Sequence, residues 1–221
     1  SAADWALANV TNYAGGSNCA KFVRASMRAG GLSIPDSVSG APVSGTTYVC
    51  ALRRALLNTN CFDEYQLTYN IENSWEWQIY ANNSSNKGHI SVGDAVFWSE
   101  KNSQAELDAE RMPHIAIVTA IESNGRVLLT DASFGNSGYR RNGNYVSGSG
   151  KSVTNSCGGN SVKSVWVLHY TGDGTSCTPP PTPSSCGCSE ANAGYYKVTA
   201  TDGLSVNSGH NFNSKCGELS Y

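Results

Sequence analysis

Apolar residues in the first sixty positions of the chain recur at the spacing of amphipathic helices. Residues 19–29 show this most clearly, because their apolar side chains recur at steps of three and four and the segment stops at the glycine pair 30–31. Residues 2–13 and residues 48–57 have the same character. The apolar side of the clearest helix consists of Cys19, Phe22, Val23, Ser26 and Met27. The N-terminal part of the chain is therefore predicted to be helical.

The second half of the chain has a different pattern, with short runs rich in β-branched and aromatic residues. The dipeptide Asn124-Gly125 between two such runs is a strong hairpin signal. Residues 72–80 fit either a helix or a strand. The predicted strands are residues 93–98, 114–122, 126–131 and 164–170. Helices followed by antiparallel strands predict an α+β domain in which the helices pack on an antiparallel sheet.

A proline-rich segment, residues 172–185, interrupts these patterns. Proline keeps such a segment extended and semi-rigid. We therefore expect a linker between a catalytic domain of residues 1–171 and a small disulfide-rich segment of residues 186–221. That last segment is too short to bury a core by itself. It needs disulfides, the main domain or further sequence to be stable.

Charge and hydropathy exclude several classes of partner. The formal net charge of −2 gives no electrostatic attraction to nucleic acid or to an anionic membrane surface. No apolar run approaches the roughly 18 residues that a membrane span needs. The chain begins at Ser1 without a basic and apolar leader, so we expect any signal peptide to have been removed. We expect the protein to be a monomer. The sequence motifs at Asn9, Asn82 and Asn83 fit the pattern for N-glycosylation.

Eight cysteines in a chain of this size are typical of an oxidising, extracellular compartment, so we expect a secreted protein. The expected pairs are Cys50 with Cys61, Cys157 with Cys177, and Cys186 or Cys188 with Cys216. If Cys19 is a free thiol, an odd number of cysteines remains and one of them lacks a partner in this chain. The alternative is that Cys19 is itself half of a disulfide.

Cys19 is the strongest candidate for a reactive residue. It opens a predicted helix directly after a glycine turn, where Ser17 or Asn18 can cap the helix. The first-turn N–H groups and the positive end of the helix dipole favour the thiolate, which lowers the pKa of the thiol and raises its nucleophilicity. A cysteine hydrolase needs, in addition, a base and a residue that orients the base.

His114 and Asp131, on the predicted hairpin, supply that base and its orienting residue. A two-residue turn at Asn124-Gly125 sets Asp131 opposite Val118, and a bulge near the turn sets it opposite His114. Both registers place Asp131 on the face of His114. Cys19 then attacks a carbonyl, His114 transfers the proton and Asp131 holds the imidazole tautomer. The backbone N–H of Cys19, with a neighbouring polar side chain, is the expected oxyanion site.

The other histidines and possible metal ligands give no competing site. His89 is interpreted as a surface loop residue, and Asp94 as a turn residue. His169 in a strand and His210 in the tail receive no role. The histidines are scattered without a metal-binding spacing, and residues 186–188 suit a disulfide region better than a zinc pair. We expect neither a metal nor a cofactor.

Four short segments, taken together, resemble peptidoglycan hydrolases of the CHAP and NlpC type. Residues 18–24 resemble their nucleophile segment, residues 93–98 their Gly-Asp strand and residues 113–118 their general-base strand. Residues 130–132 fall where a third polar residue is expected. The resemblance covers about residues 2–170 and implies a papain-like fold. It also implies cleavage of amide bonds in bacterial cell-wall peptides, with Cys19, His114 and Asp131 as catalytic residues.

The C-terminal segment carries a second resemblance. Residues 196–209 are similar to the first strands of bacterial SH3-like wall-binding modules, although the segment is shorter than a whole module. This likeness implies bacterial peptidoglycan as the partner. The many cysteines and the Pro/Thr-rich linker depart from ordinary bacterial members and fit a eukaryotic, secreted version better.

Two other functions remain open from the sequence. A muramidase would cleave the glycan strand with two carboxylates roughly 5–9.5 Å apart. The possible partners of Asp131 in such a pair are Glu100, Glu106, Glu110 and Glu122. A non-catalytic wall-binding protein would instead stack exposed Trp75, Trp77, Trp98 and tyrosines on sugars. Whichever function holds, Trp75 and Trp98 are the predicted substrate-binding residues. The loops at residues 33–47 and 139–159 do not reveal which bond is cut.

Overall fold

The computed structural model describes residues 1–16, 18–72, 76–107, 112, 114–134, 138–146 and 162–172. The chain divides into two units, Ser1–Pro179 and Pro180–Tyr221, and the description below concerns the first. The division falls within residues 172–185, the predicted linker. The predictions for Cys157, Cys177 and the cysteines of the C-terminal segment lie outside the described residues, as do the wall-binding likeness and Trp75.

The N-terminal part of the chain is helical, as predicted. The described helices are α1 (Ala2–Asn9), the 3-10 helix η1 (Val10–Tyr13), α2 (Cys19–Ala29), α3 (Val49–Leu57) and α4 (Gln104–Leu107). The predicted helix over residues 2–13 is therefore an α-helix that tightens into a 3-10 turn. Ser1 and Asp4 form a capping box at its start. None of the described helices has the length and apolar character that crossing a membrane requires.

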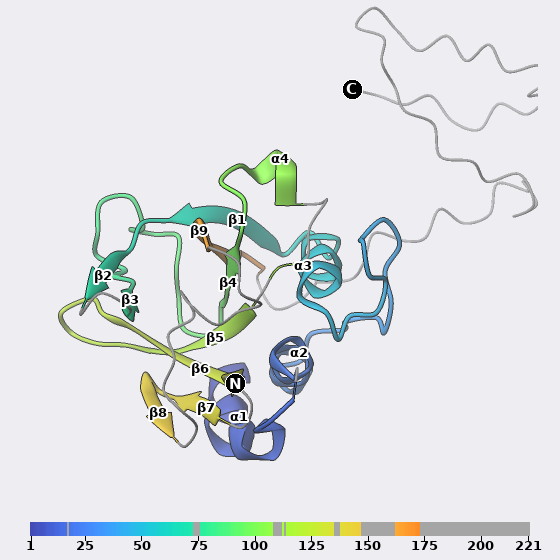
Figure 1. Cartoon of the computed structure of the whole chain (residues 1–221), viewed down its shortest axis with the longest axis horizontal. Coiled ribbons are helices and arrows are strands. Elements are labelled where there is room, and N and C mark those ends of the chain that lie inside the picture. The colour runs from blue at the N-terminus through green and yellow to red at the C-terminus, as the bar shows by residue number, and fades with distance from the viewer. Residues whose placement is uncertain are drawn as a thin grey trace, which may run out of the picture. The chain divides into compact units, whose positions relative to one another are not determined.

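A seven-stranded antiparallel sheet, with strand order β1-β9-β4-β5-β6-β7-β8, forms the centre of the domain (Figure 1). Its strands are β1 (Phe62–Leu67), β4 (Ala95–Ser99), β5 (His114–Ile121), β6 (Val127–Phe134), β7 (Gly138–Arg141), β8 (Asn144–Val146) and β9 (Ser164–Tyr170). A separate antiparallel pair, β2 (Asn70–Glu72) and β3 (Glu76–Gln78), includes the described residues 72 and 76–78 of the ambiguous segment 72–80, which are therefore strand rather than helix. The α+β class with an antiparallel sheet is thus confirmed.

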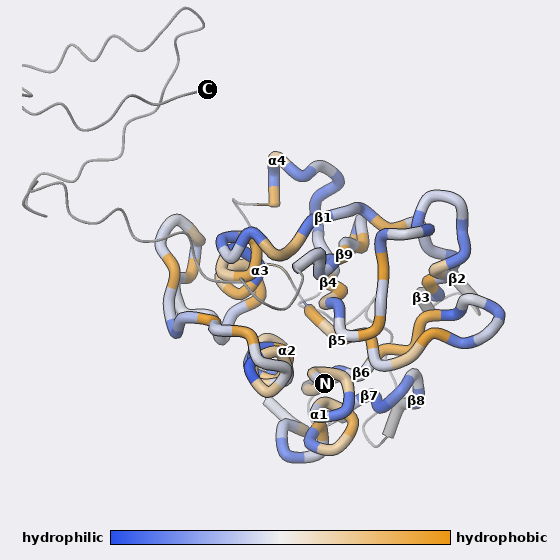
Figure 2. The backbone as a smooth tube through the Cα atoms, turned by 180° about the vertical axis from the view of Figure 1, so that it is seen from behind, coloured by the Kyte–Doolittle hydropathy of each residue, from blue (hydrophilic) through white to orange (hydrophobic). Residues whose placement is uncertain are grey.

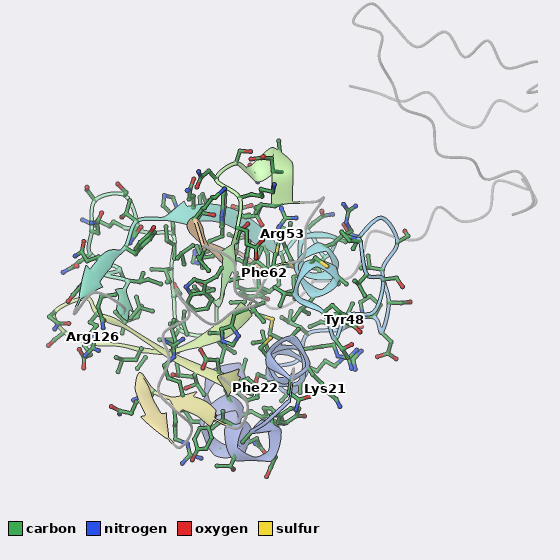
Figure 3. The ribbon with its side chains drawn as sticks, viewed as in Figure 1. Lys21, Phe22, Tyr48, Arg53, Phe62 and Arg126 are labelled. Atoms are coloured by element: carbon green, nitrogen blue, oxygen red, sulfur yellow. The ribbon has the colours of Figure 1, made fainter. Side chains whose placement is uncertain are left out.

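The two faces of the sheet are buried by different partners. Helices α1, α2 and α3 cover the face that carries Ile115 and Ile117, and Phe22 of α2 is completely buried there while Lys21 is exposed (Figure 3). Trp98 and Ala116 lie in a second core on the opposite face. Burial on both sides explains why β5 is coloured as a hydrophobic segment in Figure 2 rather than alternating between apolar and polar residues.

An aromatic cluster fixes the start of α2 against the preceding helix. The rings of Trp5, Tyr13 and Phe22 lie with their centroids 5.6–6.4 Å apart, a spacing at which aromatic pairs attract. Gly15 and Gly16 both adopt positive φ between Tyr13 and α2, which a side chain at either position would disfavour. The chain therefore turns sharply and places Cys19 at the beginning of a well-anchored helix.

The hairpin of β5 and β6 closes with a three-residue loop rather than the two-residue turn considered above. Glu122 pairs with Arg126 through its N–H, and Gly125 has a φ of +88°. The register then shifts between Val118 and Ala120, and the ladder continues with Ile117 opposite Thr130. This register lies between the two that the sequence suggested. It differs from each of those two registers by two residues, and only a difference of an odd number would turn Asp131 to the other face of the sheet. Asp131 therefore still shares the face of His114.

The predicted pairing of Cys50 with Cys61 is wrong. Cys50 is buried in α3 as a free thiol, whereas Cys61 is disulfide-bonded. The side chain of Arg53 on α3 instead connects this helix to β1, through a buried ion pair with Glu64 (Figure 3). Cys19 is the other free cysteine among the described residues. With Cys19 and Cys50 both free, the number of remaining cysteines is even. A free Cys19 therefore no longer requires that one of the remaining cysteines lack a partner.

Candidate active site

Cys19 is the first residue of α2 and is partly exposed. Burial of its sulfur raises the pKa of the thiol, but the imidazole of His114 and the backbone N–H groups of Ala20 and Ile115 outweigh this effect. The net result is a pKa below the ordinary value for cysteine. Because these groups interact with the charged sulfur, the site stabilises a thiolate.

His114 is the first residue of β5 and contacts Cys19 at the start of α2. Its Nε2 atom lies 3.3 Å from Oδ2 of Asp131, which leaves Nδ1 for the thiol. Complete burial lowers the pKa of the imidazole, but Asp131 and Cys19 overcome this and hold the pKa well above its ordinary value. The lowered pKa of Cys19 favours its thiolate and the raised pKa of His114 favours its imidazolium, as an imidazolium–thiolate pair requires.

Asp131 is completely buried on β6, beside Arg140 of β7. Burial raises the pKa of the carboxyl group, but the charge of Arg140 and the contact with His114 bring it below its usual range. The guanidinium of Arg140 contacts the same Oδ2 atom that faces His114. Asp131 is therefore held as a carboxylate by partners on two strands.

The four side chains form a row of alternating charge: Arg140, Asp131, His114 and Cys19. A buried row of this kind is stable only because each charge has a neighbour of opposite sign. Chemically, it offers a nucleophilic sulfur, a proton carrier next to it and a carboxylate that fixes the orientation of that carrier. The structure thus brings together all three residues that the sequence predicted as catalytic.

The expected cap of α2 is only partly present. Asn18 occupies the cap position but makes no capping hydrogen bond with its side chain. Its amide donates to the carbonyl oxygens of Gly15 and Tyr13 instead and so stabilises the turn before the helix. Ser17 lies outside the described residues. Asn18 is therefore not the polar side chain expected to complete an oxyanion site with the N–H of Cys19.

Trp98 does not have the exposed position that substrate stacking requires. Its side chain is 1% exposed and lies beside His114, with ring centroids 5.4 Å apart. The guanidinium carbon of Arg140 lies 5.8 Å from the centre of the indole ring. The expected exposure of Trp98 is thus wrong, because its ring lies against residues of the candidate site, and its role in substrate binding stays a prediction.

Arg140 is the residue of this site that the sequence analysis missed. It lies within residues 139–159, which were interpreted as a loop, but β7 and β8 pair there around a tight turn. Asn142 and Gly143 form that turn, with φ values of +48° and +80°. The dipeptide Asn142-Gly143 is the same hairpin signal as Asn124-Gly125, and it would have placed Arg140 on a strand.

Asp94 and His169 form a second buried pair away from this site. Nδ1 of His169 lies 2.7 Å from Oδ2 of Asp94. Asp94 also accepts hydrogen bonds from the backbone N–H groups of Ser91 and Tyr170, so it holds a turn as predicted and ties that turn to β9. No group of three or more His, Cys, Asp or Glu residues in the described part of the chain is arranged to hold a metal ion. His210 lies outside that part.

Comparison of the chain with protein-family models, with curated proteins and with solved structures finds no significant match. Its fold and site are therefore interpreted from its own residues.

Proposed function

We propose that this protein is a secreted cysteine hydrolase that cleaves amide bonds in the peptides of bacterial peptidoglycan, with a papain-like catalytic domain. The observation that carries the proposal is the row formed by Cys19, His114 and Asp131 at the start of a helix. A thiol whose pKa is lowered by a buried imidazole is typical of a nucleophile rather than of a structural cysteine.

The proposed reaction begins when the thiolate of Cys19 attacks the carbonyl carbon of the scissile amide. The backbone N–H of Cys19, in the first turn of α2, donates to the oxyanion that develops. His114 then gives its proton to the leaving amine, and a thioester remains on the sulfur. In the second half, His114 takes a proton from water, the resulting hydroxide equivalent attacks the thioester, and the thiolate is released.

Asp131 keeps His114 in the orientation that both steps need. Its carboxylate is buried and has a lowered pKa, so it remains charged while the imidazole gains and loses its proton. The carboxylate therefore stabilises the imidazolium and fixes Nδ1 toward the sulfur without accepting the proton itself.

The substrate class rests on the resemblance to CHAP and NlpC-type hydrolases. The segments that carry it converge at one place in the fold, since residues 18–24 begin α2 and the other two main segments form β4 and β5. Strands β4 and β5 are direct neighbours, with Trp98 opposite His114. Segments that are far apart in the sequence thus meet around the candidate nucleophile. The disulfide bond at Cys61 supports an extracellular location.

The two alternative functions find less support. A muramidase needs a general acid with a raised pKa beside the sugar, whereas Asp131 is buried, is held by Arg140 and has a lowered pKa. A wall-binding protein without catalysis would use exposed tryptophans, and Trp98 is buried. Glu110 and Trp75 lie outside the described residues.

The test is a digestion of purified peptidoglycan, followed by separate measurement of new amino groups and new reducing ends. The proposal predicts new amines, no new reducing ends, and a loss of about 10³-fold or more in Cys19→Ala. Cys50→Ala is the matched control, because it removes the other free thiol and should retain activity. New reducing ends that persist in Cys19→Ala would identify a muramidase. Sedimentation with cell walls without any product would identify a binding protein.

A further inference from the structure

Arg140 has an unusual position for an arginine. Its side chain is only 7% exposed, and it forms an ion pair with the carboxylate of Asp131, its direct partner across β6 and β7. The neighbouring Arg141 is half-buried and packs over the ring of Tyr139 instead, with the guanidinium carbon 5.6 Å from the ring centre. Two consecutive arginines on one strand thus have different environments, and only Arg140 contacts the candidate site.

The carboxylate of Asp131 uses one oxygen for both of its charged partners. Arg140 and His114 contact Oδ2, while Oδ1 has no hydrogen-bond partner among the described residues. A carboxylate could otherwise rotate about its last bond and present either oxygen to the imidazole. The contact with Arg140 fixes which oxygen His114 meets, and the indole of Trp98 packs against both the guanidinium and the imidazole.

We propose that Arg140 is a positioning residue of this site, which holds the carboxylate of Asp131 toward His114 and balances its charge. This inference rests on the proposed function, because it assigns Arg140 to the same Cys19–His114 pair. Arg140 acts through Asp131 and does not contact the reacting atoms.

The electrostatic consequence follows from the charges that face one another. The carboxylate of Asp131 interacts with the charges of Arg140 and His114. The imidazole of His114 interacts with the charges of Asp131 and Cys19, and the thiolate of Cys19 with that of His114. With all four groups charged the row is neutral, and without Arg140 it carries one excess negative charge. That charge opposes formation of the thiolate, so the pKa of Cys19 rises. A charge a few ångströms away in a buried site changes a pKa by about one unit or more.

The test measures the rate at which iodoacetamide alkylates Cys19 as a function of pH, with the modified peptide quantified by mass spectrometry. Arg140→Met should move the midpoint of this profile up by about one pH unit, which is about tenfold in rate at a fixed pH below it. Arg140→Lys keeps the charge and should restore most of the wild-type profile. Arg141→Met is the matched control on the same strand and should leave the profile unchanged.

A folded Arg140→Met protein with the wild-type midpoint would overturn the proposal and leave Arg140 with a structural role only. If this variant does not fold, Asp131→Asn and the double variant Asp131→Asn/Arg140→Met decide the matter. Asp131→Asn removes the carboxylate from both proteins, and adding Arg140→Met then removes a positive charge, so the midpoint of Cys19 should lie higher in the double variant than in Asp131→Asn. Equal midpoints in these two variants would also overturn the proposal. Because alkylation needs no substrate, these results remain readable if the protein does not cleave peptidoglycan.

Discussion

Nε2 of His114 lies 3.3 Å from Oδ2 of Asp131 although the two residues are not opposite each other in the sheet. The ladder that pairs Ile117 with Thr130 sets Asp131 level with Ala116, one step along the same face from His114. Diagonal neighbours on one face lie within reach of long side chains.

Asp131→Asn should reduce both activity and stability. The amide cannot stabilise the imidazolium as a carboxylate does, so we expect activity to fall by about 10²–10⁴-fold. The variant also removes one partner of the buried ion pair with Arg140, a change that costs about 3–5 kcal/mol of unfolding free energy. The double variant Asp131→Asn/Arg140→Met should recover much of the stability and none of the activity. Denaturant unfolding and peptidoglycan digestion measure the two effects, and recovery of activity in the double variant would contradict the role of Asp131.

The same carboxylate predicts a specific dependence of stability on pH. Its pKa is lower in the folded protein than in the unfolded chain, so its contribution is complete above the unfolded value. That contribution is lost as the pH falls through the folded value. Between neutral pH and strong acid, the unfolding free energy of the wild type should therefore decrease more than that of Asp131→Asn/Arg140→Met. Parallel curves for the two proteins would show that the pKa of Asp131 is not lowered.

The architecture could be predicted from the sequence wherever a segment has its own periodicity or turn signal. The helix over residues 19–29 has the predicted bounds, because its apolar spacing and terminal glycines agree. Strand β1 was missed, since charged and polar residues separate the two buried residues at its ends and hide any alternation of apolar and polar positions. The segment 72–80 was ambiguous because a three-residue hairpin strand is too short to show a period.

The candidate site could be predicted as far as its three reactive residues but not beyond them. Their residue types and order suggest the chemistry, and strand alternation places two of them on one face. The position of Arg140 depends on which strand pairs with β6, and the burial of Trp98 depends on what covers the sheet. Both are properties of tertiary packing. Whether Cys50 forms a disulfide likewise depends on the direction in which its side chain leaves α3. The sequence spacing between Cys50 and Cys61 does not determine that direction.

His114→Gln should raise the pKa of Cys19 and slow its reaction. Without the imidazole, burial of the sulfur is opposed only by the backbone N–H groups of Ala20 and Ile115. We expect alkylation of Cys19 at pH 6–7 to fall by about tenfold or more, and its midpoint to move toward alkaline pH. An unchanged profile in a folded His114→Gln protein would show that the helix end alone activates the thiol.

Arg53→Met should destabilise the fold without altering the chemistry of the site. The side chain of Glu64 is 1% exposed, and its carboxylate accepts hydrogen bonds from Arg53 and from the amide of Gln104. Among the described residues, the variant leaves the amide of Gln104 as its side-chain partner. Loss of its counter-charge should cost about 3–5 kcal/mol, and Arg53→Met/Glu64→Leu should recover most of it. Denaturant unfolding of the single and double variants checks this. Equal losses in both would show that packing of the arginine stem, rather than charge, connects α3 to β1.

Trp98→Phe should affect stability rather than wall binding. The phenyl ring is smaller than the indole, so a small cavity forms in the core and we expect a loss of about 1–2 kcal/mol. Sedimentation with peptidoglycan, measured in a Cys19→Ala background so that the wall stays intact, should not change. A tenfold loss of wall affinity with unchanged stability would show that Trp98 contacts the substrate after all.

Alkylation of the native protein without reductant tests the central claim most directly, because every step above requires a free, reactive Cys19. At pH 6–7, iodoacetamide should modify Cys19 rapidly and leave the buried Cys50 unmodified until the protein is unfolded. Peptide mapping by mass spectrometry distinguishes the two thiols. The account would be contradicted if Cys19 were found in a disulfide, or if it reacted at neutral pH no faster than an ordinary cysteine.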